Sequence, residues 1–136
     1  MPIPPDPRTA IAALLKAKVE QAEGRVFRPE LPKEERAFMP RAAIVVFAGG
    51  GGGMFGRDRL EVWDSVLDIA VYGSTREEAE NIADEALYAM RNMGRELWAE
   101  ILVHWIRIAG GVKSAIDPET NWPFAILTVQ AMTQSP

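Results

Sequence analysis

Two stretches of the chain repeat apolar residues with the period of an α-helix. The first runs from about Pro7 to Glu23, preceded by Asp6 and followed by Gly24. Asp is a favourable N-cap, and proline at the first helical position loses no hydrogen bond, because that N–H has no partner in a helix. The expected buried residues share one helical face: Ile11, Ala12, Leu14, Leu15, Val19 and Ala22.

The second helical pattern follows Gly73 and ends near residues 92–94. Ser74 and Thr75 are each followed three residues later by Glu, which makes a capping box, and an acidic first turn suits the helix dipole. The apolar residues of this segment again share one face: Ala79, Ile82, Ala83, Ala86, Leu87 and Met90.

Strand patterns occupy much of the remaining sequence. Residues 42–47 are apolar on both faces, which is typical of a central strand. Residues 59–72 alternate for longer than the usual ~5–6 residues. We therefore expect a bulge or bend near Asp64 and Ser65, or an arm that projects beyond the sheet.

Two further strands are expected at residues 100–109 and 124–132, and a short one at residues 25–27. Alternation places Ile101, Val103 and Trp105 on one face of the 100–109 strand. The order is helix, strands, helix, strands. The pattern predicts an α+β fold in which a mixed, mostly antiparallel sheet of four to five strands packs with two α-helices.

The chain of 136 residues is 48% hydrophobic and 25% charged, which fits a single domain over residues 1–136. Residues 1–5 are rich in proline and are expected to form an arm. Residues 48–58 are expected to form a flexible glycine-rich loop, because five consecutive glycines lose too much backbone entropy to hold a regular element. This loop has an apolar tip that suits docking of a partner.

Composition removes several kinds of site. The chain has no cysteine and one histidine, so thiolate sites and zinc sites built from several Cys or His ligands are excluded. A net charge of -4 with scattered basic residues disfavours a nucleic-acid surface. The N-terminus lacks the layout of a signal peptide, and no apolar run approaches the ~18 residues that span a bilayer. We expect synthesis in the cytosol.

The remaining candidates for chemistry are weak. The glycine run lacks the Gly-Lys-Ser/Thr ending of a phosphate-binding loop and leads into a strand. Asp64 and Asp68 share a strand face and could serve acid–base or metal chemistry, although salt-bridged or solvated carboxylates are commoner. His104 lies between apolar residues, as a structural histidine would. We expect no catalytic residue, cofactor or metal.

The four tryptophans indicate surfaces that meet other proteins. Aromatic residues are enriched in both cores and interfaces, and one small core does not hold four tryptophans comfortably. We expect at least one of them at a subunit contact. With the loop tip and its neighbours, the expected partner-interface residues are Met54, Phe55, Arg57, Arg59, Trp63 and Trp122.

A series of short motifs follows in order along residues 6–92. After the first helix come a short strand at 25–27, a Leu-Pro pair at 31–32, and Pro40 before an apolar strand. A strand that ends in Tyr-Gly follows at 68–73, and then a helix start with Ser74-Thr75 and Glu78-Ala79. In this order the chain resembles the tail terminator, or tail completion, proteins of long-tailed bacteriophages and related neck proteins. The final two strands fit that pattern only loosely.

The resemblance implies a subunit that closes into a homo-hexameric ring. Such a ring caps the tail tube, stops its polymerisation and joins the tail to the head connector or stopper protein. DNA passes through the lumen without sequence-specific binding. No enzyme activity or cofactor goes with the resemblance. The implied location is the tail or neck of the virion, and the host cytoplasm during assembly.

A second hypothesis comes from another class. The helix and strand order also suits a small-molecule-binding regulatory module of ferredoxin-like type, with its ligand near Gly110 and Gly111. A metabolite that raises the melting temperature would favour this hypothesis, because ligand binding stabilises the native state. An enzymatic interpretation rests on Asp64 and Asp68 alone.

Overall fold

The computed structural model describes residues 6–28, 30–48, 54–57 and 62–134. Within these ranges the chain forms two α-helices and two 3-10 helices: α1 (Pro7–Lys18), η1 (Glu20–Ala22), η2 (Lys33–Phe38) and α2 (Arg76–Arg91). The same ranges contain seven strands: β1 (Val26–Phe27), β2 (Ala43–Ala48), β3 (Met54–Arg57), β4 (Val62–Tyr72), β5 (Glu96–Trp98), β6 (Ile101–Ile116) and β7 (Pro123–Gln134). No helix within them is long and apolar enough to cross a bilayer.

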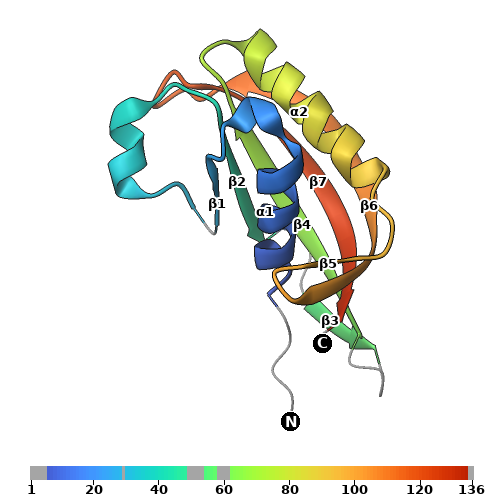
Figure 1. The fold of residues 1–136 in the computed structure, drawn as a ribbon. Helices are drawn as coiled ribbons and strands as arrows, with labels where there is room; N and C mark the ends of the chain where they lie inside the picture. The colour runs from blue at the N-terminus through green and yellow to red at the C-terminus, as the bar shows by residue number, and fades with distance from the viewer. Residues whose placement is uncertain (1–5, 29, 49–53, 58–61, 135–136) are drawn as a thin grey trace.

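All of these strands join one curled sheet (Figure 1). Its order is β1-β2-β4-β7-β6-β5, and β3 also pairs with β4. The pair β1–β2 is parallel, and the other pairs are antiparallel. The predicted sheet of four to five strands is therefore wrong, because the described residues form seven. The unexpected strands are β3 and β5, which are too short to show an alternating pattern.

Strands β2 and β3 pair with the same edge of β4. Ala48 pairs with Leu67 and Met54 pairs with Ser65, so the partners of β2 and β3 on β4 are separated by Val66 alone. The pairing with β4 thus resumes after the glycines, and the chain reverses between Arg57 and Val62. The loop predicted at 48–58 is wrong at Ala48, which belongs to β2, and at 54–57, which form β3. Residues 49–53 and 58, and the arm predicted at 1–5, lie outside the described residues.

The first helix begins where the sequence predicts and ends earlier. Asp6 is the N-cap, but α1 stops at Lys18. The next turn tightens into η1, which still buries Ala22 completely. Positive φ angles at Glu23 and Gly24, of 54° and 76°, then turn the chain into β1. The predicted buried face is retained through this change, except that Ala12 is only partly buried.

Both α-helices pack on the same face of the sheet. The sheet curls around α1, which contacts β1 near one edge and β5 near the other. Between β4 and α2, Gly73 allows a close approach, since a Cβ there would lie 2.6 Å from the backbone nitrogen of Ala79. The resulting core contains fully buried aliphatic residues from both layers: Ile11, Leu15, Val46, Ile69, Ile82, Leu127 and Val129.

The start of α1 is held by Asp6. Its Oδ1 accepts a hydrogen bond from the Arg8 backbone N–H at 3.0 Å, and its carboxylate pairs with the side chains of Arg8 and Arg28 at 3.0 and 3.3 Å. Partial burial alone raises the pKa of Asp6, but the hydrogen bonds and charges of the two arginines outweigh it. The pKa of Asp6 therefore lies below its ordinary value of 3.8.

We expect Asp6→Ala to lower the free energy of unfolding by about 1 kcal/mol, because the N-cap is lost. Urea denaturation at pH 7 measures this change. Asp6→Asn is the matched control, since asparagine also caps a helix but carries no charge. A loss in the asparagine variant as large as in the alanine variant would show that the charge, and not the cap, holds the helix start.

The comparison of wild type with Asp6→Asn also has a defined pH dependence. A lowered folded pKa contributes stability that is present above the unfolded pKa and is lost as pH falls through the folded pKa. The stability difference between the two proteins is therefore largest near neutral pH and shrinks below pH 3.8. A difference that stays constant from pH 7 to pH 3 would contradict the charge pairing.

Candidate functional site

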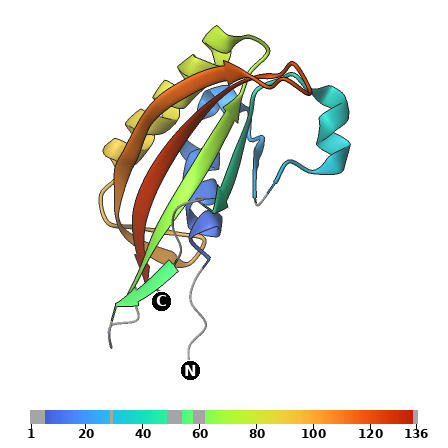
Figure 2. The same cartoon turned by 180° about the vertical axis from the view of Figure 1, so that it is seen from behind.

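The sheet face opposite α1 and α2, seen in Figure 2, is the candidate functional surface. We call it the outer face. Strand residues alternate between the two faces, so the outer-face residues are those between the core residues of β4, β6 and β7. They form cross-strand rows: Asp64, Met132 and Trp105; Val66, Gln130 and Arg107; Asp68 and Thr128; Ala70, Ile126 and Lys113; Tyr72, Phe124 and Ala115.

A bulge in β6 brings Trp105 to this face. Val103 pairs with Thr133 and Trp105 pairs with Met132, so His104 is an extra residue in the ladder. An extra residue reverses the alternation that follows it. The prediction that Val103 and Trp105 share a face is therefore wrong: Val103 is fully buried, whereas Trp105 is partly buried.

The bulge predicted near Asp64 and Ser65 of β4 is also wrong. Residues Val62 to Tyr72 pair with β7 without a register shift, and the irregularities in this part of the sheet lie in β6. Strand β6 also continues to Ile116, seven residues beyond the predicted end at residue 109. Gly110 and Gly111, near which the regulatory-module hypothesis placed a ligand, are part of this strand.

The segment around η2 covers one end of the outer face. Leu31 from this segment packs with Ala43, Val45 and Ala70 in a second apolar cluster. A cavity of about 280 Å³ remains between the segment and the sheet. Its walls include Arg36, Phe47, Tyr72 and Trp122. The rows from Asp64 to Asp68 lie beyond this cluster.

Arg25 fastens the η2 segment to the sheet. Its side chain, only 10% exposed, donates hydrogen bonds to the Ala42 carbonyl at 3.0 Å and to Glu35 Oε2 at 2.8 Å. Glu35 belongs to η2, and Ala42 immediately precedes β2. The buried guanidinium therefore connects β1, β2 and η2, and it limits how far η2 can move from the outer face.

The outer-face rows beyond the second apolar cluster combine polar and apolar groups. Asp68 accepts a hydrogen bond from Thr128 Oγ1 at 2.6 Å, which holds that carboxylate within the sheet. Asp64 is 7% exposed. In β6, on the far side of β7 from β4, the Arg107 guanidinium lies 4.9 Å from the centre of the Trp105 ring. Arginine, methionine and aromatic residues are enriched at protein interfaces, and Met132 beside this pair completes such a set.

The histidine and carboxylate candidates do not gather into one chemical site. His104 Nε2 lies 2.7 Å from Gln134 Oε1 at the end of β7. Asp64 and Asp68 lie four residues apart in the regular β4 ladder, with Val66 midway between them. Within the described ranges, no three His, Asp or Glu side chains come together as a metal site.

The structure separates the predicted interface residues into two locations. Met54, Phe55 and Arg57 belong to β3, and Trp63 pairs with Gly56 in the same hairpin. Trp122 instead packs edge-on against Tyr72, with ring centres 6.0 Å apart. Trp63 and Tyr72 are nine residues apart on one strand, about 30 Å at 3.3 Å per residue. Arg59 lies outside the described residues.

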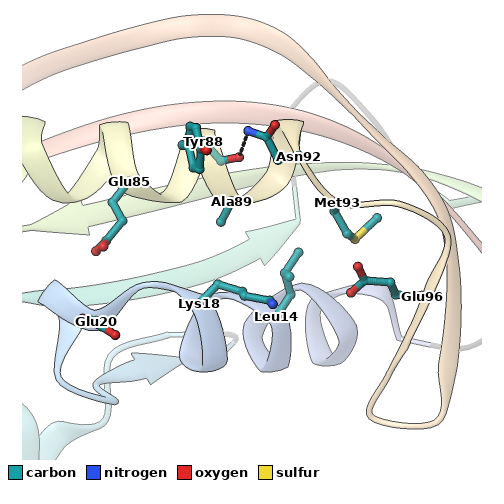
Figure 3. Close-up of a pocket in the computed structure, with 9 residues that line it drawn as sticks. All are labelled: Leu14, Lys18, Glu20, Glu85, Tyr88, Ala89, Asn92, Met93 and Glu96. Carbon is teal, nitrogen blue, oxygen red and sulfur yellow. Dashed lines mark hydrogen bonds between the residues drawn. The ribbon is translucent and has the colours of Figure 1, made fainter.

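A groove between the helices is a feature that the sequence does not predict (Figure 3). It has a volume of about 360 Å³ and lies between α1 and α2. The residues that line it include three acidic ones, Glu20, Glu85 and Glu96, and one basic one, Lys18. Tyr88, at its rim, is 71% exposed. The available signal was Tyr88 itself, an aromatic residue on the polar face of an amphipathic helix.

No protein-family model matches the chain, and no curated protein matches its sequence significantly. The outer face and the two ends of the sheet therefore carry the functional argument.

We expect Arg25→Ala to lower the free energy of unfolding by about 2 kcal/mol, because it removes a buried donor from two acceptors. Hydrogen exchange should also become faster in residues 30–39. Arg41→Ala is the control, since the exposed Arg41–Glu23 pair at 3.1 Å is expected to contribute at most about 1 kcal/mol. Equal effects of the two substitutions would contradict the fastening role of Arg25.

Proposed function

We propose that the chain is a structural protein of virion assembly, a ring-forming tail terminator of a long-tailed bacteriophage. Six copies form a ring that caps the tail tube, stops its polymerisation and joins the tail to the head connector or stopper protein. DNA passes through the ring without sequence-specific binding. The protein acts in the host cytoplasm during assembly and afterwards in the tail or neck of the virion.

The observation that carries this proposal is the outer face. Both α-helices cover the opposite side of the sheet, and the η2 segment covers only one end. Arg107 is exposed there, Trp105 and Met132 are partly buried, and none of the three belongs to an apolar cluster of the described residues. Such groups serve protein contacts, because an aromatic ring and a methionine bury apolar area while arginine supplies hydrogen bonds.

The order of motifs along residues 6–92 supports a tail terminator as the kind of assembly protein proposed. The Tyr-Gly ending of β4 leads directly into the Thr75 cap of α2. Thr75 Oγ1 accepts a hydrogen bond from the Glu78 backbone N–H at 3.1 Å, and Glu78 accepts one from the Ser74 backbone N–H at 3.0 Å. Residues 68–79, which carry part of the resemblance, thus build one continuous strand-to-helix junction.

The purified protein is expected to form rings of six, counted by mass photometry and seen by negative-stain microscopy. Added to polymerising tail tube protein of the same phage, the rings should bind tube ends and stop elongation. A protein that stays monomeric at every concentration and does not bind tubes would contradict the proposal. A metabolite that stabilises this monomer would support the regulatory-module hypothesis.

Trp105→Ala tests the outer face within this assembly. The substitution should weaken the apparent affinity between subunits at least tenfold, about 1.4 kcal/mol, because tryptophan is a frequent interface anchor. Fewer rings should then form at a fixed concentration. Circular dichroism checks that the fold is retained. Tyr88→Ala, at a more exposed aromatic residue on α2, is the matched control and should leave ring formation unchanged. The reverse ranking would move the contact to the helix side.

A further inference from the structure

The outer edge of β6 lacks a neighbour over most of its length. Strand β5 pairs only with Ile101 to Val103, whereas β6 extends to Ile116. Among the described residues, no strand pairs with the outer edge from His104 onward. Such an edge presents alternating backbone donors and acceptors, and the group that satisfies them best is another extended strand.

Bulges restrict where a strand can add to this edge. Register shifts fall between Val103 and Trp105 and again between Ile108 and Lys113. Bulges twist an edge and discourage general pairing. Between them, Trp105 to Ile108 pair with β7 residue for residue, so this is a regular four-residue stretch. The edge therefore suits a short strand of defined length.

The same molecule carries a strand of that length at its other end. Strand β3, Met54–Arg57, has four residues. It pairs with β4 on one side, and no described strand pairs with its other side. In Figures 1 and 2, β3 lies at the end of the sheet away from α2. Neither helix is drawn over it.

Strand directions fit the two edges together. Because β3–β4, β4–β7 and β7–β6 are all antiparallel, β3 runs antiparallel to β6 within one subunit. A second copy in the same orientation therefore brings its β3 antiparallel to the first copy's β6. Two different edges make a heterologous contact, which generates a ring when the rotation closes.

The register is also defined. When residues 54–57 lie opposite 108–105, Phe55 faces Arg107 and Arg57 faces Trp105. Phe55 and Arg57 pair with Asp64 and Val62, which occupy outer-face positions of β4. Arg107 and Trp105 pair with Gln130 and Met132, which occupy outer-face positions of β7. This register keeps the outer faces of both copies on one side of the joined sheet, as the two-residue period of strands requires.

We propose that copies of this chain join edge to edge, with β3 of one subunit adding antiparallel to the Trp105–Ile108 edge of β6 in the next. The contact rests on the proposed ring and specifies how its subunits meet. It joins the curled sheets of neighbouring subunits into one continuous sheet, in which the rows of the outer face continue from copy to copy.

Engineered disulfides test this contact directly, because the chain contains no cysteine. Two double variants, Phe55→Cys with Arg107→Cys and Arg57→Cys with Trp105→Cys, sample the same register at neighbouring positions. After oxidation, non-reducing gels should show the monomer band replaced by a ladder that ends at the ring. The single variants and the control pair Phe55→Cys with Tyr88→Cys should remain monomeric on the gel.

Other results separate the two proposals. Crosslinking of Arg107→Cys alone would indicate a two-fold β6–β6 contact and would overturn the β3–β6 assignment. Rings in mass photometry without crosslinks in either double variant would overturn the contact and leave the proposed function standing. Monomers in both measurements would overturn both. Circular dichroism of each variant confirms that the fold is retained before oxidation.

Discussion

Packing of both helices on one face of the sheet is the constraint from which the other features follow. Apolar burial stabilises by about 25 cal/mol per Å², and α1 and α2 concentrate that burial on the inner face of the sheet. Ile11, Ile69 and Leu127 are fully enclosed there. The sheet curls around α1, and its outer face and long β6 edge are left for other contacts.

Two of the side chains that could serve chemistry have polar partners within the sheet. Asp68 is hydrogen-bonded to Thr128, and His104 lies against Gln134. In contrast, Trp105 and Arg107 stack beside Met132 on the outer face. The Arg25 contacts hold η2 over the other end of that face, so the surface available to a partner has a defined boundary.

Sequence periodicity predicted the long elements because each has one clearly apolar face. Helix α2 starts at its Thr75 cap and buries Ala79, Ile82 and Ala86 as expected. Short-range irregularities were not predictable. The extra residue at His104 reverses the faces of β6 with no Gly or Pro to signal it, and the pairing of β3 beyond five glycines depends on contacts with β4 that periodicity cannot reveal. The predicted interface residues lie in two places for the same reason, because the sequence does not show that Trp63 and Trp122 are at opposite ends of the sheet.

Hydrogen exchange of the β6 backbone amides, measured as a function of protein concentration, is the most direct test. It shows whether a neighbouring subunit pairs with the outer edge of β6, which is unpaired from His104 onward among the described residues of one subunit. The account predicts that the amides of residues 105–108 that point away from β7 exchange quickly at concentrations where the protein is monomeric and become protected as it assembles. Core amides of β7 should stay protected throughout. Exchange at 105–108 that does not change between the monomeric and assembled protein would contradict the account.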